Sequence, residues 1–526
     1  MHILRYLTVI SITFVAISCA QLPKDFNAPH TTAIDSKSTM DTRLGKNVAK
    51  HYSSGDMRSK IFPTPEGTDA FFARMLLAHT AERTLDVQYY IWHKDLIGQL
   101  LLGKLLEAAD RGVRVRLLID DISNQELDEY VYALDRHKNF EVRLFNPFAS
   151  RKHRIADYIS SPIRVNRRMH NKTFTADNQF AIVGGRNIGD EYFSAGLENN
   201  FKDIDGIIIG PIVQEVSTSF DTYWNSSVVF PVSAFKANQA TDNDLDKVRT
   251  TLAEFRAAQQ NSDYSADMES SQLYQDFVAG KIQTNVYQGD TELIYDDPRK
   301  ALGMSDKEIT YLHNLLGPYF RNVNERLEIL SPYFVPGKRG VTFLSDLVKK
   351  GIKVRVITNS LASTDGVLAQ SGYQKYRIKL LRAGVELYEL KPNAVKKSLR
   401  RSKHAKSGLH AKVYDFDRKA VFIGSFNLDQ RSSNINTEVG VVYKIPELAG
   451  EVASRLEKGV ETSAYKVELI TLPPNKNDSF PTEDFRVEWV SQENGKEIRY
   501  TKDPNTSGWD RFVVWFYGIL PVESQL

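Results

Sequence analysis

Hydrophobic and polar positions follow one order along the chain, and that order occurs twice. Apolar runs typical of strands surround a stretch that has the one-sided apolar spacing of a helix. The strand, helix and two strands expected in each half are residues 85–92, 96–110, 113–119 and 142–145, and residues 327–335, 341–350, 352–357 and 385–390. Strands that alternate with helices favour parallel pairing with helices on both faces of the sheet. We therefore expect an α/β fold of two tandem units, each a mainly parallel sheet flanked by helices, packed about a pseudo-twofold axis.

The segments outside these units have a different pattern. Residues 20–60 are polar and show no helical or strand period, so we expect a tether there. Residues 236–284 predict a helical connector with one narrow apolar stripe, formed by Leu245, Val248, Leu252 and Phe255. The expected division is a terminal segment at 1–19, the tether at 20–60, a first unit at 61–235, the connector at 236–284, a second unit at 285–465 and an extension at 466–526.

The extension ends in an aromatic segment at residues 509–520, which contains Phe512, Trp515, Phe516 and Tyr517. Aromatic side chains in such a segment can pack as an edge element on the body of the protein. They can also face lipid, because their rings suit the boundary between water and hydrocarbon. The sequence leaves both alternatives open.

The repeat is closest at a strand–turn–strand segment that occurs once in each half. Each copy holds a histidine, a lysine two positions later, an aspartate in the turn and an asparagine after the returning strand. The copies are His170, Lys172, Asp177 and Asn187, and His410, Lys412, Asp417 and Asn427. Alternate residues of a strand point to the same face, so we expect each histidine beside its lysine. Two copies with matching spacing indicate a duplicated unit.

These paired motifs resemble the two HKD motifs of the phospholipase D superfamily, and the resemblance extends from about residue 60 to the end of the chain. Residues 89–92, 184–192, 296–298 and 425–432 also resemble the bacterial cardiolipin synthase branch, type C in particular. The resemblance implies two phospholipase D-like α/β units and phosphatidyl transfer through a phosphohistidine, with no cofactor. It also implies that His170, the N-terminal copy, is the nucleophile, an order that the residues themselves leave open.

Paired histidines and lysines suit the transfer of a phosphate ester. With an ordinary pKa of about 6.5, one histidine can be neutral and the other protonated near neutral pH. The neutral imidazole can attack phosphorus, and the imidazolium can protonate the departing alkoxide. Lys172 and Lys412 supply positive charge, and hydrogen bonds to the phosphate oxygens are expected from Asn187, Asn427 and Ser425. No metal is expected, since the sequence contains neither a zinc-ligand spacing nor a carboxylate cluster of metal-site type.

Further carboxylates complete the predicted site. Asp177 and Asp417 are the third motif residues, but they fall in hairpin turns, where aspartate bonds nearby backbone, so a supporting role is favoured over direct chemistry. A nucleophilic histidine also needs an acceptor that holds its second nitrogen. By the resemblance, Glu438 lies where the family places such a carboxylate. The first half offers Asp203 or Asp205, and the spacing leaves both open.

Composition adds a prediction about targeting. The chain has 526 residues, a formal net charge of +3 and one cysteine, so no internal disulfide can form. Residues 6–18 are mostly apolar and follow Arg5, a pattern too short to span a bilayer but typical of a secretory signal. Residues 16–19 resemble a bacterial lipoprotein cleavage box, which implies a lipid anchor on Cys19 in the cell envelope; an uncleaved anchor or a plain signal is the alternative. No other run is long enough to cross a membrane.

Basic residues are concentrated before each motif. They are Arg151, Lys152, Arg154, Arg164, Arg167 and Arg168 in the first half, and Lys391, Lys396, Lys397, Arg400, Arg401, Lys403 and Lys406 in the second. In a chain of nearly neutral net charge, such clusters favour an anionic surface. We expect phospholipids and their membrane surface as partners and no nucleic acid, because Tyr158 is the only aromatic residue in these loops that could stack on bases. The sequence does not identify a partner subunit.

The predicted function is phosphatidyl transfer between phospholipids at a membrane, as cardiolipin synthesis with phosphatidylglycerol as the acceptor. A hydrolytic phospholipase D, in which water accepts the phosphatidyl group, is the first alternative, and a nuclease is the second. A non-catalytic lipid-binding scaffold would normally carry a damaged motif, whereas both motifs are intact. Exclusion of water from the intermediate separates transfer from hydrolysis, and the sequence does not reveal it.

Overall fold

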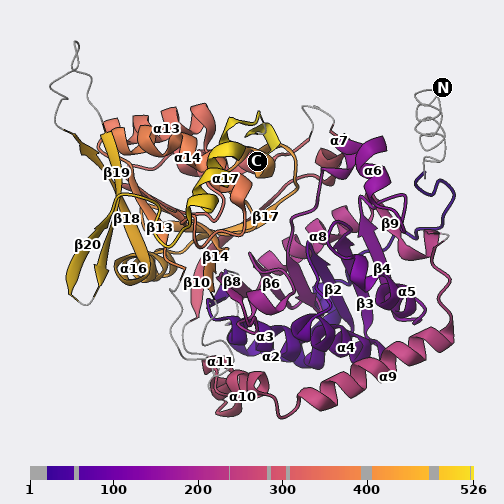
Figure 1. The fold of residues 1–526 in the computed structure, drawn as a ribbon. Helices are drawn as coiled ribbons and strands as arrows, with labels where there is room; N and C mark the ends of the chain where they lie inside the picture. The colour runs from indigo at the N-terminus through magenta and orange to yellow at the C-terminus, as the bar shows by residue number, and fades with distance from the viewer. Residues whose placement is uncertain are drawn as a thin grey trace, which may run out of the picture.

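The computed structural model describes residues 21–52, 58–235, 237–280, 286–303, 309–392, 406–472, 485–493, 495–521 and 523–525. Two α/β units lie side by side, the first indigo to magenta and the second orange to yellow in Figure 1. The expected fold class of two tandem α/β units is therefore confirmed.

Three parallel strands form the centre of the first unit: β2 (Thr84–Tyr89), β3 (Arg114–Asp120) and β4 (Phe140–Phe145). The remaining strands of its sheet are β5 (Thr173–Ala176), β6 (Phe180–Gly184), β8 (Asp205–Ile209), β1 (Ser59–Thr64) and β9 (Val229–Pro231). Its helices are α3 (Gly67–Thr80), α4 (Leu96–Asp110), α5 (Asp128–Leu134), α6 (Ile155–Ser160), α7 (Pro162–Val165) and α8 (Ile212–Trp224).

The second unit repeats this plan with β11 (Arg326–Leu330), β12 (Lys353–Asn359) and β13 (Glu386–Leu390) as its parallel strands. The other strands are β15 (Lys412–Phe416), β16 (Ala420–Gly424), β17 (Val439–Lys444), β10 (Tyr287–Tyr295), β18 (Ala464–Thr471), β19 (Phe485–Glu493) and β20 (Lys496–Tyr500). Its helices are α12 (Leu312–Arg321), α13 (Gly337–Lys349), α14 (Val367–Arg382), α15 (Gln430–Asn434), α16 (Pro446–Ser463) and α17 (Gly508–Ile519).

Both sheets are mixed rather than mainly parallel. Among the described strands, parallel pairing within a unit is confined to its three central strands, whereas the hairpin β5–β6 pairs antiparallel with β2, and β15–β16 pairs antiparallel with β11. The reason is the tight hairpin turn, which reverses the chain without a crossover helix. Its two central residues have positive φ, 50° at both Asp177 and Asn178 and 58° and 53° at Asp417 and Arg418, as the turns that match strand twist require.

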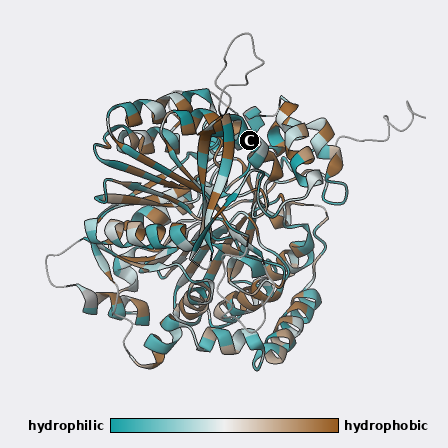
Figure 2. Cartoon of the chain, turned by 60° about the vertical axis from the view of Figure 1, so that its left-hand side comes forward, coloured by the Kyte–Doolittle hydropathy of each residue, from teal (hydrophilic) through white to brown (hydrophobic). Residues whose placement is uncertain are grey.

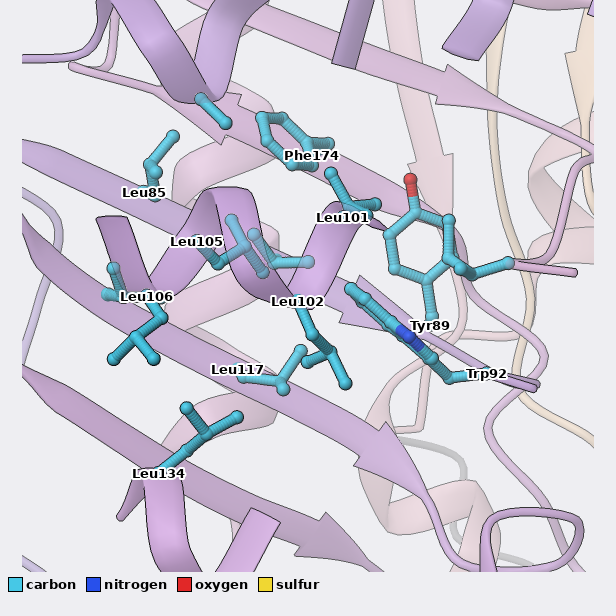
Figure 3. Close-up of a cluster of buried hydrophobic side chains, with 14 of the residues drawn as sticks. Leu85, Tyr89, Trp92, Leu101, Leu102, Leu105, Leu106, Leu117, Leu134 and Phe174 are labelled. Atoms are coloured by element: carbon cyan, nitrogen blue, oxygen red, sulfur yellow. The ribbon is translucent and has the colours of Figure 1, made fainter. Parts of the chain in front are cut away.

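Apolar packing fills each unit and also joins them. Figure 3 shows the first core, where Leu101 and Leu105 of α4 lie among side chains of the central strands such as Leu85 and Leu117. Another buried cluster contains side chains from both units, among them Val183 and Val421. The sheets are also joined by antiparallel pairing of β1 with β10, and β7 (Asn199–Lys202) pairs with β14 (Lys406–Leu409). The two halves thus form one body, with the motif hairpins at its centre.

The expectation of a structureless tether is wrong for residues 21–52. Helix α2 (Arg43–His51) begins at a Thr42 cap and buries Leu44 against the first unit. The extended part before it bonds α8, with Ala33 N–H donating to the Asp221 carboxylate at 2.8 Å. Polar groups of α8 also pair with the backbone of this segment, and a search for apolar periodicity cannot detect such a contact.

The connector and the extension both contain helices. After η4 (Val232–Ala234), the connector forms α9 (Asp242–Gln259), α10 (Asp263–Glu269) and α11 (Gln272–Val278). The predicted stripe lies on α9, where Leu245, Val248 and Leu252 are buried. The extension adds β18, β19 and β20 beyond β13 and ends with α17. Within the described part of the chain, no helix combines the length and the apolar character that crossing a membrane requires.

Candidate active site

The two motif histidines precede their strands rather than lie within them. His170 lies between α7 and β5, and His410 lies between β14 and β15. The backbone N–H of His170 donates to Thr437 O at 2.8 Å, and that of His410 donates to Lys202 O at 2.9 Å. Each histidine is therefore held by backbone of the opposite half, which is why it leaves the pairing of its own hairpin.

A carboxylate from the opposite half holds Nδ1 of each histidine. His170 Nδ1 lies 2.8 Å from Glu438 Oε2, and His410 Nδ1 lies 2.6 Å from Asp203 Oδ2. The Asp203 carboxylate accepts from His410, and the Ser425 carbonyl, 3.1 Å from His170 Nδ1, can only accept, so each Nδ1 carries the hydrogen and each Nε2 atom is left for chemistry. Asp205, the other candidate in the first half, instead pairs with Arg74 at 2.9 Å and Arg186 at 3.2 Å.

Each motif lysine contacts the backbone of the histidine in its own motif. Lys172 Nζ donates to His170 O at 2.6 Å, and Lys412 Nζ donates to His410 O. Both side chains are buried. Lys172 and Lys412 each lower the pKa of both imidazoles, so the four groups form one electrostatic cluster.

Burial is the largest influence on the pKa values of the two histidines. It lowers the pKa of His410 to about 4, together with the charge of Lys412, while Asp203 opposes the shift. Burial and the two lysines lower the pKa of His170 well below its ordinary value. Both shifts favour the neutral imidazoles, and the expectation that one ring is neutral and the other protonated during the reaction stays a prediction. A phosphodiester anion bound among these groups would raise both pKa values, because it favours the charged forms.

The two carboxylates differ in their own ionisation. The pKa of Asp203 falls to about 2; burial opposes the shift, but the His410 hydrogen bond and the nearby cations prevail. The pKa of Glu438 rises to about 7, because burial outweighs Lys172 and the hydroxyl donors of Ser425 and Ser432. The His410 pair thus holds a fixed negative charge near neutral pH, and the His170 pair does not.

The small polar residues divide into two groups. Ser425 Oγ donates to Glu438 at 2.5 Å, so it orients that carboxylate instead of facing a phosphate, contrary to expectation. The side-chain oxygens of Asn187 and Asn427 are buried and lack a hydrogen-bond partner among the described residues. Rotation of an amide presents nitrogen in place of oxygen, so each asparagine can donate to a phosphate oxygen.

The motif aspartates lie at the far ends of the hairpins and contact neither histidine. The buried Asp177 carboxylate accepts from the backbone N–H groups of Arg83 at 2.7 Å and Thr84 at 3.0 Å. Asp417 accepts in the same way from Glu325 and Arg326, both at 2.9 Å. Each aspartate ties its hairpin turn to the start of the neighbouring parallel strand, which is a structural contact.

Replacing Asp177 by asparagine is therefore expected to lower stability by about 1–3 kcal/mol, since an amide presents only one acceptor to several buried donors. Asp417→Asn should cost less, because this half-buried turn lets water replace the lost acceptor. Thermal unfolding measures both effects. Loss of turnover at an unchanged unfolding midpoint would contradict the structural role and make these residues part of the chemistry.

The structure adds contacts that the motif analysis missed. The Tyr90 ring lies 4.9 Å from that of His170, and the Tyr192 ring lies 5.0 Å from that of His410. Ser432 Oγ donates to Glu438 at 2.8 Å, and Glu438 N–H donates to buried Asp296 at 2.9 Å. Tyr90, Tyr192, Ser432 and Asp296 all belong to the segments that carried the resemblance. Their position in those segments was the sequence signal that could have identified them.

The first basic loop does not form a free cationic surface. Arg168 is fully buried and pairs with Asp120 at 3.3 Å. Arg151 and Arg154 are also buried, and both pair with Asp121 and Asp128. Asp121 and Asp128 follow β3 in the chain. Their negative charges neutralise the two arginines inside the fold. Most of the second basic loop, from Lys396 to Lys403, lies outside the described residues.

The search for metal-binding geometry covers the described ranges only. Within them, no group of three or more histidine, cysteine, aspartate or glutamate side chains is arranged to hold a metal ion.

Comparisons with known proteins agree on the fold. The family described as "Cardiolipin synthase, PLD-like domain" matches residues 76–224 and 319–460. Cardiolipin synthase C of Escherichia coli (strain K12) is 41% identical over 489 residues, which are 92% of this chain and 100% of that protein. An uncharacterized protein of Helicobacter pylori (strain J99) is 30% identical over 488 residues, 91% of this chain and 92% of that protein. The crystal structure of phosphatidylserine synthase from Haemophilus influenzae Rd KW20 matches with a TM-score of 0.54 and 15% identity, over 80% of this chain and 91% of that one.

Proposed function

The chain belongs to the family of cardiolipin synthases with phospholipase D-like domains, and we propose from this premise that it is a phosphatidyltransferase that makes cardiolipin. Phosphatidylglycerol is the proposed acceptor. The observation that carries the proposal is the pair of crossed contacts, His170 with Glu438 and His410 with Asp203. They leave two Nε2 atoms for one phosphodiester, as in-line exchange through a covalent intermediate requires.

In the first half of the reaction, His170 Nε2 attacks phosphorus of the donor lipid and the bond to the head alcohol breaks. His410, protonated on Nε2, gives this proton to the departing oxygen, so the alcohol leaves neutral. In the second half, His410 takes the proton from the acceptor hydroxyl, whose oxygen attacks phosphorus and releases His170. Asp203 supports these roles, because its negative charge favours the imidazolium form of His410. His170 has no such fixed charge at its Nδ1 and stays a neutral nucleophile.

The lysines and asparagines are proposed to bind the phosphate oxygens. Lys172 and Lys412 are buried beside both histidines, where the low dielectric strengthens their attraction to developing negative charge. Burial lowers the pKa of Lys412 to about 8, so it remains mainly protonated at neutral pH. Asn187 and Asn427 can donate to the same oxygens, which places both motifs around one phosphate.

The lipid profile of cells that express the chain, with and without the two histidines, tests the proposed function. Intact chain should convert phosphatidylglycerol into cardiolipin, and the histidine-free variant should not. Histidine-dependent release of phosphatidic acid without cardiolipin would show that water is the acceptor and that the enzyme is a hydrolase. DNA cleavage that depends on the histidines, with an unchanged lipid profile, would replace the proposal with a nuclease.

The proposed location is the membrane of a bacterial cell envelope. Cys19 as the anchor stays a prediction, since it lies outside the described residues. Mass spectrometry of the purified N-terminus tests it: a mature chain should begin at a lipidated Cys19, and a chain that retains Met1 would contradict the lipoprotein anchor.

A further inference from the structure

The segment before the first motif exposes apolar side chains and buries charged ones. On α6 and α7, Ile155 and Ile163 are each 76% exposed, and Ile159 is 62% exposed. The arginines of the same segment, Arg151 and Arg154, turn inward to Asp121 and Asp128. A helix at a water-facing surface normally shows the reverse arrangement. The buried ion pairs therefore hold two short helices whose outer face is apolar.

Helix α17 in the extension also exposes large apolar side chains. Ser507 and Asp510 form a capping box at its start, and Val514 packs inward. The exposed face is apolar and mainly aromatic, and consists of Trp509, Phe512, Trp515, Phe516 and Ile519. The Trp509 and Phe512 rings stack with centroids 5.4 Å apart. This helix is ordered by its cap and its packing, and not by burial of its aromatic face.

Polar contacts tie both ends of α17 to α14. Before the helix, Asp503 pairs with Arg377 at 3.4 Å. After it, Glu523 accepts a hydrogen bond from Tyr376 and pairs with Lys375 at 3.8 Å. The direction of the aromatic face is therefore set by the body of the second unit.

The chain after α17 contacts the chain after α7 close to the histidine pair. Asn166, directly after α7, donates to Gln525 in η6 (Glu523–Gln525) at 2.6 Å and accepts from Arg431 at 2.9 Å. The charge of Arg431 in turn lowers the pKa of His170. Figure 1 shows α6, α7 and α17 toward the upper side, with α10 and α11 at the lower side. Hydrophobic residues are visible on helices near the C-terminus in Figure 2.

We propose that α6, α7 and α17 form a docking face that inserts into the interface of a phospholipid bilayer and brings the histidine pair to its lipids. The docking face consists of the exposed apolar residues of the three helices: Ile155, Ile159, Ile163, Trp509, Phe512, Trp515, Phe516 and Ile519. The proposal rests on the proposed function, because a phosphatidyl donor must leave a bilayer close to the site that it enters. Tryptophan and isoleucine next to polar helix ends suit this interface. With 12 residues, α17 is about 18 Å long, shorter than the roughly 30 Å of a hydrocarbon core, so it lies on the membrane.

Co-sedimentation with vesicles of phosphatidylcholine, alone or mixed with phosphatidylglycerol, tests the docking face. Two triple variants are compared with the intact chain: Ile155→Ser with Ile159→Ser and Ile163→Ser, and Trp509→Ser with Trp515→Ser and Ile519→Ser. Each should weaken binding at least about tenfold on both vesicle types, because moving one large apolar side chain out of water is worth about a decade in partitioning. Turnover should fall on vesicles and stay unchanged on substrate dispersed in detergent.

Val278→Ser is the matched control. Val278 ends α11, which lies toward the lower side in Figure 1, away from α6, α7 and α17, and is 67% exposed, so its loss should leave vesicle binding unchanged. Thermal unfolding of each variant verifies that the fold is kept. Unchanged vesicle binding by both triple variants would overturn the docking face, and so would dimers that dissociate in the variants without a change in vesicle binding. If the intact chain transfers no phosphatidyl group but the triple variants lose vesicle binding, the docking face is supported and the proposed function is rejected.

Discussion

Replacing either His170 or His410 by alanine is expected to reduce phosphatidyl transfer by about 10³-fold or more, because one site uses both rings. Each ring depends on a carboxylate from the opposite half, so neither half contains a complete active site. The measurement is the initial rate of cardiolipin formation by purified variants. His79→Ala is the matched control, since this histidine lies exposed at the end of α3 and should leave the rate unchanged.

A donor lipid with a nitrophenyl head group separates the two roles. Nitrophenolate leaves without a proton, so the first half of the reaction no longer needs a general acid. The His410→Ala variant should then release nitrophenolate at a rate close to that of the intact chain, whereas His170→Ala should remain inactive. The opposite result, or a phosphate adduct trapped on His410, would reverse the assignment of nucleophile and acid. A single-alanine variant with near-normal cardiolipin synthesis would contradict the shared site.

Local patterns predicted the elements that depend on local packing. Residues 96–110 form α4 over the expected range, because their one-sided apolar spacing determines which face is buried. The stripe on α9 was predicted for the same reason. The motif repeat likewise identified the histidines, since their duplication is visible without knowing what they contact. In each case the decisive information lies within a short stretch of chain.

Contacts between distant segments could not be predicted in this way. Whether Asp203 or Asp205 faces a histidine depends on Arg74, which binds Asp205 at 2.9 Å across the first unit. The inward direction of the Arg154 side chain depends on Asp121. Asp121 follows β3, whereas Arg154 follows β4. A count of charges along the sequence cannot distinguish a basic surface from arginines that are neutralised inside the fold. The crossing of each carboxylate to the other half is equally a property of how the units pack.

Replacing the two orienting carboxylates is expected to give losses with different pH dependence. Asp203 has a pKa of about 2 and is ionised at every pH near neutrality, so Asp203→Asn should slow transfer about 10²-fold or more between about pH 5 and pH 9. Glu438 has a pKa raised to about 7. Below that pH it is already neutral and resembles an amide, while above it the intact chain carries a negative charge that Glu438→Gln lacks. The loss in Glu438→Gln should therefore grow as the pH rises through about 7.

The ratio of intact to variant rates, measured across this pH range, tests the difference between the two halves. Asp246→Asn and Glu254→Gln repeat the same chemical changes at exposed positions of α9, and their ratios should stay near one throughout. A loss in Glu438→Gln that is constant across the range, or a loss in Asp203→Asn that disappears below pH 7, would contradict the unequal ionisation of the two carboxylates. It would also remove the reason for making His410 the acid, because that role depends on a fixed negative charge beside its Nδ1 atom.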